Sequence, residues 1–165
     1  MARQAMRSQG ASQLELELIF EAAKLVENAR LALSLDDAFG RLQELTSIEI
    51  VLLAGGESRL AAARPQNMLA IESPRAGDTV AGGTITVAGL VPEVEGSLNV
   101  QLISREGRVL KSIDLRPTGD EGEERTFSAD LIYSLDEAAW VQVAVSWRQA
   151  GIITAFKSVE VWLVP

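Results

Sequence analysis

The strongest constraint on the fold of this chain of 165 residues is a series of short runs, after position 67, that are rich in β-branched and aromatic residues. Turn residues such as Gly and Pro separate the runs, whose starts are 11–17 residues apart, as in antiparallel all-β domains. The runs are Met68–Ile71, Thr84–Leu90, Ser97–Ser104, Val109–Leu115, Thr126–Ile132, Val141–Trp147 and Ile152–Val164. Because no connection holds a long helical crossover, they predict seven strands in an antiparallel two-sheet sandwich.

Alternation within the runs indicates that each strand has one buried face. Leu98, Val100 and Leu102 alternate with polar residues, and the run Val141–Trp147 alternates in the same way. Trp147 continues the inward-facing series and is expected in the core. We therefore expect residues 68–165 to form a seven-stranded immunoglobulin-like β-sandwich.

The first part of the chain shows a helical period instead. The segment from Ser12 to about Leu33 has apolar residues three or four positions apart, which is typical of an amphipathic helix. They are Leu14, Leu18, Ala22, Leu25, Ala29 and Ala32, flanked by Ile19, Val26 and Leu33. Ser34 is then expected to cap a second, shorter helix, with Asp37 near its start and Leu45 near its end.

A β-hairpin is expected to follow these two helices. Its strands are Ile48–Leu53 and Ser58–Ala63, and Gly55-Gly56 forms the turn. The prediction for residues 12–63 is thus a small α+β unit of the order helix, helix, hairpin. Residues 1–11 are expected to be disordered, and residues 64–67 to form a polar linker to the sandwich.

The apolar stripe of the first helix is wider than one packed neighbour needs. Leu18, Leu25, Ile19 and Val26 are therefore predicted to contact a partner, and the helix to mediate attachment or a homodimer.

Trp162 is the fifth predicted contact residue. It alternates with Val161 and Leu163, so it faces outward if those two face the core. The alternative, in which Trp162 packs under the N-terminal helices, remains equally open at this point.

Composition excludes much catalytic chemistry. The chain has no Cys and no His, which removes thiol nucleophiles, disulfides, imidazole bases and the metal sites that need those ligands, so no cofactor is predicted. Its net charge of −8 disfavours nucleic acid and anionic membrane surfaces as partners.

The sequence predicts neither a membrane span nor a secretory signal. The apolar segment that follows Arg3 and Arg7 is interrupted by Glu15, Glu17 and Lys24. The compartment is therefore left open.

Carboxylates are the remaining acid–base groups, and they leave two alternatives. Asp130 with Asp136 or Glu137 would suit a hydrolase that uses paired carboxylates. The run Asp120–Glu124 is the densest acidic cluster and raises the question of calcium binding, although its spacing is not that of a known calcium loop.

The turn signals of the second half resemble the Gmad2 family, the immunoglobulin-like module of bacterial spore-germination and envelope-associated proteins. The matching segments are Ile71–Pro74 followed by Gly77 and Val80, Ile85–Gly89, Glu95-Gly96, Leu98–Leu102, Glu106–Leu110, and Phe127 with Leu131 and Tyr133. The resemblance covers about residues 69–164 and departs from the family at Gln149–Gly151. It implies a binding or scaffolding role and, if a leader was removed, the cell envelope.

A shorter resemblance concerns the first half, where Leu33–Phe39 and Ile50–Leu53 are similar to the opening of a GAF domain. It leaves a fragment of a ligand-sensing protein as a further alternative. The main hypothesis is a non-enzymatic binding or scaffolding module that contacts a protein or an envelope polymer.

Overall fold

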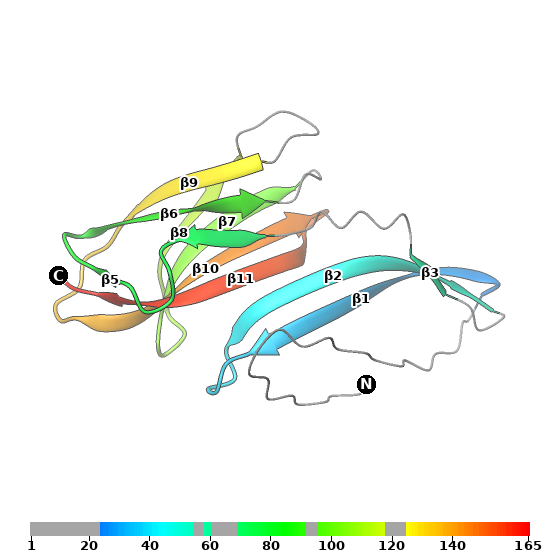
Figure 1. Ribbon diagram of the computed structural model, residues 1–165, viewed down its shortest axis with the longest axis horizontal. Coiled ribbons are helices and arrows are strands. Elements are labelled where there is room, and N and C mark those ends of the chain that lie inside the picture. Colours follow the sequence, from blue (N-terminus) through cyan, green and yellow to red (C-terminus); the bar gives the residue numbers. More distant parts are fainter. Residues whose placement is uncertain (1–23, 55–57, 61–68, 92–95, 118–124) are drawn as a thin grey trace.

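The computed structural model describes residues 24–54, 58–60, 69–91, 96–117 and 125–165, and this part of the chain contains strands and no helix (Figure 1). The strands are β1 (Val26–Asp36), β2 (Leu42–Leu53), β3 (Ser58–Leu60), β4 (Ala70–Ser73), β5 (Thr79–Val80), β6 (Thr84–Val91), β7 (Ser97–Ser104), β8 (Val109–Leu115), β9 (Arg125–Ile132), β10 (Ala139–Gln149) and β11 (Ile152–Leu163). The protein is therefore mainly β.

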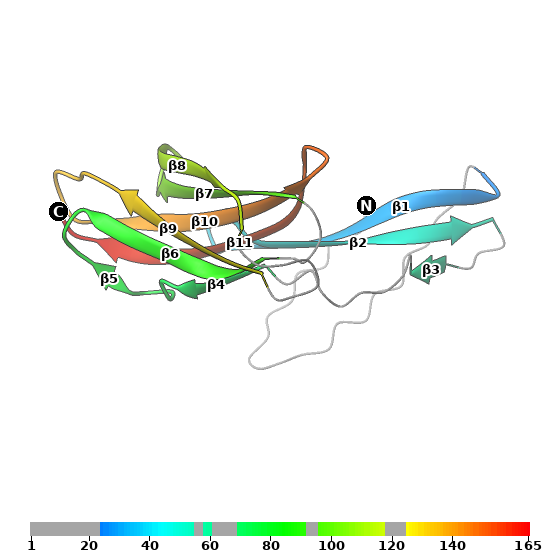
Figure 2. The same cartoon turned by 90° about the horizontal axis from the view of Figure 1, so that it is seen from above.

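The strands form two sheets. The larger has eight strands in the order β1-β2-β11-β10-β7-β8, with β3 beside β2 and β5 parallel to β11, and the smaller has the order β4-β6-β9. All other pairings are antiparallel. Figure 2 shows β4, β6 and β9 layered on the β10–β11 part of the larger sheet, which is a sandwich arrangement.

The core lies between these two layers. Leu98 and Val100 of β7 and Val143 and Trp147 of β10 are completely buried, and Ile85 of β6 is almost so. Along β6 and β7 the core residues alternate with less buried ones, as the sequence predicted. In β10 the prediction of a single buried face is wrong, because both faces are buried from Val141 to Trp147. Each of the seven expected runs contains a strand in its described part, although Met68 lies outside the described residues and β4 begins at Ala70. Trp147 is in the core, as expected, whereas the short strand β5 was not predicted.

Two features fix the edges of the sandwich. The hydroxyl of Tyr133 lies 3.0 Å from the carbonyl oxygens of both Val80 and Val164, and so ties the end of β9 to β5 and to the residue after β11. Gly89 of β6 lies so close to β4 that a Cβ there would stand 1.9 Å from the carbonyl oxygen of Ala70. The close approach of the two backbones thus depends on glycine.

The two expected helices are wrong wherever the structure describes them. Residues 26–36 and 42–53 are strands, which pair with each other over eleven residue pairs from Val26↔Leu53 to Asp36↔Leu42. Their cross-strand hydrogen bonds replace the local bonds that a helix would make. The preceding part of the expected first helix, residues 12–23, lies outside the described residues, as does the expected disorder of residues 1–11.

A turn takes the place of the expected start of the second helix. Asp37 Oδ1 accepts hydrogen bonds from the backbone N–H groups of Phe39 and Arg41, both at 2.8 Å. Gly40 adopts a positive φ of 78°, which glycine tolerates best. These contacts reverse the chain between β1 and β2 instead of starting a helix.

The hairpin expected at residues 48–63 is present in its described part. Ile50, Val51 and Leu52 of β2 pair antiparallel with the three residues of β3. Residues 61–63 and the expected linker at 64–67 lie outside the described residues.

Candidate binding surface

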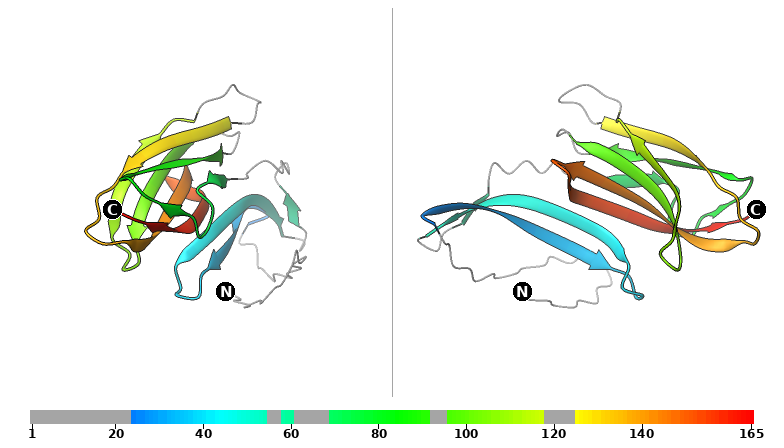
Figure 3. Two further views of the ribbon diagram at one scale, coloured as in Figure 1. Left: turned by 60° about the vertical axis from the view of Figure 1, so that its left-hand side comes forward. Right: turned by 180° about the vertical axis from the view of Figure 1, so that it is seen from behind.

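The β1–β2 hairpin extends beyond the sandwich. Only three residue pairs join β2 to the sandwich edge, from Thr46↔Ala155 to Glu44↔Lys157. The rest of the hairpin projects from the edge, as Figure 1 and the right-hand view of Figure 3 show. The hairpin is therefore an arm of the larger sheet that the smaller sheet does not cover.

One face of this arm carries most of its exposed leucine and isoleucine side chains. The register places Leu31 opposite Ile48 and Ala29 opposite Ile50, and strand alternation adds further leucines to the same face. We call this surface the leucine face, and its residues are Ala29, Leu31, Leu33, Leu35, Ile48 and Ile50. Leu33 and Leu35 are each 55% exposed, and Leu31 and Ile48 are also exposed. Thr46 and Glu44 lie opposite Leu33 and Leu35 on this face. An exposed apolar row bordered by polar residues is typical of an interaction site.

Polar contacts hold the arm on the sandwich. On the side of β10 and β11 that faces away from the core, Gln142 Nε2 donates to the backbone oxygen of Leu42 at 3.0 Å and to Ser158 Oγ at 2.7 Å. Ser47 Oγ donates to the backbone oxygen of Thr154 at 2.8 Å. Because the Gln142, Ser158 and Ser47 side chains are buried, these bonds fix the arm more firmly than exposed ones would.

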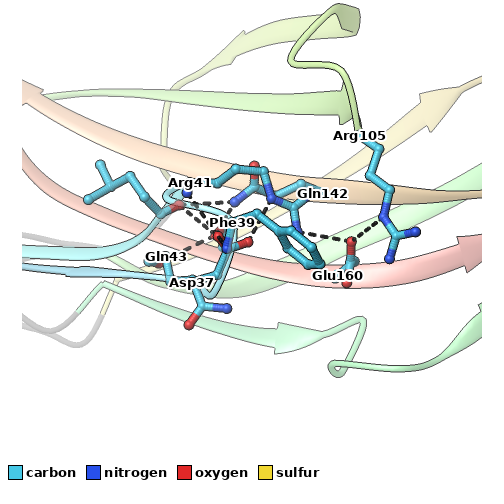
Figure 4. Close-up of polar contacts among 9 residues, drawn as sticks. Asp37, Phe39, Arg41, Gln43, Arg105, Gln142 and Glu160 are labelled. Carbon is cyan, nitrogen blue, oxygen red and sulfur yellow. Dashed lines mark hydrogen bonds and ion pairs between the residues drawn. The ribbon is translucent and has the colours of Figure 1, made fainter. Parts of the chain in front are cut away.

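An ion-pair cluster holds the turn of the arm (Figure 4). Arg41 donates from Nε to Asp37 Oδ2 at 2.6 Å and from Nη2 to Glu160 Oε1 at 3.0 Å. Arg105, in the turn after β7, lies 3.7 Å from the same Glu160 oxygen. The aromatic ring of Phe39 has the guanidinium groups of Arg41 and Arg105 5.5 and 5.6 Å from its centre. The cluster positions the turn against β11.

These contacts change the pKa of Asp37. Burial by itself raises the pKa of the Asp37 carboxyl, but hydrogen bonds from the Arg41 backbone and side chain and from the Phe39 backbone outweigh it. The pKa is therefore below its usual value of 3.8. Burial alone would lower the pKa of the Arg41 guanidinium, but its hydrogen bonds to the carboxylates of Asp37 and Glu160 raise it.

We expect the backbone amide signals of Phe39 and Arg41 to titrate with a midpoint below pH 3.8 in an NMR pH titration started at neutral pH. Since the folded-state pKa is lowered, the contribution of Asp37 to stability is complete above pH 3.8 and is lost as the pH falls through the folded-state pKa. The Asp37→Asn variant should lack this titration. A midpoint at or above the usual value would contradict the role given to Asp37.

Of the residues predicted to contact a partner, the described ones lie on two parts of the molecule, Leu25 and Val26 on the arm and Trp162 on the sandwich. Leu25, 83% exposed, and Val26 lie at the far end of the arm, and Leu18 and Ile19 lie outside the described residues. Trp162 lies on the side of β11 away from the core, half-buried, with its ring centre 5.3 Å from that of Trp140. Val161 and Leu163 are completely buried, as expected.

Beside this tryptophan pair is an open hollow between β11, the start of β2 and the turn at residues 76–77. Trp140, Glu160, Gln43 and Ala76 contribute to its lining. The two tryptophan rings are tilted by 59°, so they do not form a flat platform.

The carboxylates considered for catalysis lie on exposed surfaces. Asp130 is on the outer side of β9, where it accepts a hydrogen bond from Thr86 Oγ1 at 2.6 Å. Asp136 and Glu137 are exposed in the connection between β9 and β10. The acidic run at residues 120–124 lies outside the described residues, and within the described ones no group of three or more carboxylates is placed to bind a metal ion.

Among the described residues there is no helix long and apolar enough to cross a membrane.

The comparisons with known proteins assign no family. No family model matches the chain, and no curated protein matches it. A solved structure described as an engineered protein of the Northeast Structural Genomics Consortium is similar, with 23% identity and a TM-score of 0.45 over 69% of this chain and 24% of that one. The chain thus spans about a quarter of that protein's length, and the likeness carries no function with it.

Proposed function

We propose that this protein is a non-enzymatic binding module that presents the β1–β2 hairpin to a protein partner. The observation that carries the proposal is the leucine face: exposed apolar side chains on a hairpin that is fixed to the sandwich at one end only.

Energetics favour a partner on this face. Full burial of a leucine or isoleucine side chain stabilises a protein or a complex by about 1.5–3 kcal/mol. Much of this stabilisation is still available at the exposed side chains of Leu31, Leu33, Leu35 and Ile48. A two-stranded hairpin is also only marginally stable in water. A partner that covers the leucine face would therefore stabilise both the complex and the arm.

The order of the strands supports an immunoglobulin-like scaffold. The neighbours β11-β10-β7 correspond to strands G, F and C of that fold, and β4-β6-β9 correspond to A, B and E. The resemblance of residues 69–164 to Gmad2 modules agrees with this assignment and with a binding role.

Photo-crosslinking tests the proposal directly. A photoreactive amino acid at position 33 should yield a discrete crosslinked protein product in an extract of the source cells, because Leu33 lies in the middle of the leucine face. The same amino acid at position 132 is the matched control, since Ile132 is 70% exposed but lies on β9 of the sandwich.

The product should also depend on the apolar surface around it. Adding Leu31→Glu should abolish the product, whereas adding Ile132→Glu should leave it unchanged. Equal crosslinking from positions 33 and 132, or a product that survives Leu31→Glu, would overturn the assignment of the leucine face as a docking surface.

A further inference from the structure

The outer edge of β1 carries backbone groups that no described strand uses. In the larger sheet β1 is the terminal strand, paired only with β2. Such an edge is a template for pairing with another strand, and proteins commonly protect it with Pro, Lys or a bulge. From Val26 to Leu35, β1 contains neither Pro nor Lys, and its pairing with β2 is regular. Among the described residues, no strand pairs with this edge, which leaves it open to strand addition.

The sequence of β1 is complementary to itself in one register. Two copies that join in one continuous antiparallel sheet are related by a two-fold axis perpendicular to the sheet. When the axis passes through Leu33, Arg30 lies opposite Asp36 at both ends, Leu31 lies opposite Leu35, and Leu33 lies opposite itself. Opposite charges and apolar pairs that directly oppose each other stabilise strand pairing.

Neighbouring registers lack this match. With the axis at Ala32, Glu27 would lie opposite Asp37, and at Arg30 the two copies of that arginine would oppose each other; both arrangements place like charges together. With the axis at Leu31, Arg30 would lie opposite Ala32 and Asp36 opposite Val26. Among these registers only the one centred on Leu33 pairs Arg30 with an acidic residue.

We propose that β1 pairs antiparallel with β1 of a second copy of this chain, centred on Leu33, so that the larger sheets of two molecules become one. This inference rests on the proposed function, since the arm is again the part that binds, and it adds a contact along the strand edge to the contact on the leucine face. In the paired sheet, the leucine faces of the two copies lie side by side, one on each side of the two-fold axis through Leu33.

The surroundings of β1 are compatible with this pairing. The sandwich lies on the other side of β2 from β1, which leaves the edge facing away from its own sandwich (Figure 1). Arg30 already lies 3.5 Å from Glu49 on the neighbouring strand. Asp36 of the second copy would be a further carboxylate on the same face as this pair.

Disulfide trapping tests the register, and the absence of native cysteines makes it specific. Opposed Cα atoms in an antiparallel pair are about 4.5 or 5.5 Å apart, within the range of disulfide bonds. The purified full-length Leu33→Cys variant should therefore shift, on mild oxidation, from 17.7 kDa to twice that mass on a non-reducing gel.

Leu31→Cys and Leu35→Cys are the matched controls. Each alone should remain monomeric on the gel, because two copies of the same residue are displaced by four positions, about 13 Å along the strand. An equal mixture of these two variants should form the disulfide. Sedimentation of the unmodified protein should show a dimer that Leu33→Glu converts to a monomer.

Each other result overturns the proposed pairing. Efficient disulfide formation by Leu31→Cys alone would show another register or face-to-face packing of the arms. A monomer in sedimentation, together with no disulfide from Leu33→Cys, would exclude a second copy. If crosslinking from position 33 then still captures a different protein, the proposed function stands and only the self-pairing is wrong; if it captures none, both are wrong.

Discussion

Replacement of Gly89 by alanine is expected to lower the free energy of unfolding by about 4 kcal/mol or more. The new Cβ would stand 1.9 Å from the carbonyl oxygen of Ala70 and 3.0 Å from the Phe127 ring. The first obstacle is backbone, so β4 has to move away from β6 and lose part of the smaller sheet. Denaturant unfolding followed by circular dichroism measures the loss.

Gly107→Ala is the control for this variant. Gly107 has a φ of 82° in the turn between β7 and β8, but no atom lies within 4 Å of the position of its Cβ. The substitution should cost only about 1 kcal/mol of backbone strain. Similar losses for the two variants would show that the β4–β6 approach is not what requires glycine at position 89.

Trp147→Ala is expected to destabilise the protein by about 3–5 kcal/mol, because it empties a large volume at the centre of the core. Trp147 is completely buried, between β7 and β11 in the larger sheet. Equilibrium unfolding in urea, again followed by circular dichroism, measures the difference from the unmodified protein.

Two further variants separate volume from polarity at this position. The indole Nε1 of Trp147 is buried without a hydrogen-bond partner among the described residues. Trp147→Phe should therefore cost less than Trp147→Ala, since it keeps most of the ring and removes an unpaired donor. Trp162→Ala should lower the free energy of unfolding less than Trp147→Ala does, because Trp162 is only half-buried. A larger decrease for Trp162→Ala would contradict the central place of Trp147 in the core.

The sandwich strands were predictable because their sequence pattern is local. Along β6, β7 and β9, buried residues alternate with exposed or half-buried ones, and turn residues separate the strands. Such a pattern needs no knowledge of distant parts of the chain. The two-residue strand β5 is too short to carry it, so its parallel pairing with β11 was missed.

The arm was mistaken for helices because two periods overlap in its first strand. Val26, Ala29 and Leu33 are three or four residues apart, as in a helix, while Leu31, Leu33 and Leu35 alternate, as in a strand. Pairing with β2 makes this segment a strand rather than a helix. The local spacing of apolar residues gives no information about that distant pairing.

The candidate surface was missed for the same reason. The leucine alternation at positions 31, 33 and 35 was the signal that would have located it, had a strand been assigned there. The cluster that holds the turn had no such signal: Arg41 and Glu160 are 119 positions apart and meet only when β11 lies beside β2.

The long sequence separation of the contacts that hold the arm has a consequence during synthesis on the ribosome. The hydrogen bond of Ser47 can form only after Thr154, 107 positions later, has been added to the chain. That of Leu42 can form only after Gln142, 100 positions later, has been added. At about 5–20 residues per second, this delay is about 5–20 s. During this time the nascent hairpin carries its leucines without the strand that anchors it, so we expect the leucine face to bind chaperones or other nascent copies until β11 has been made.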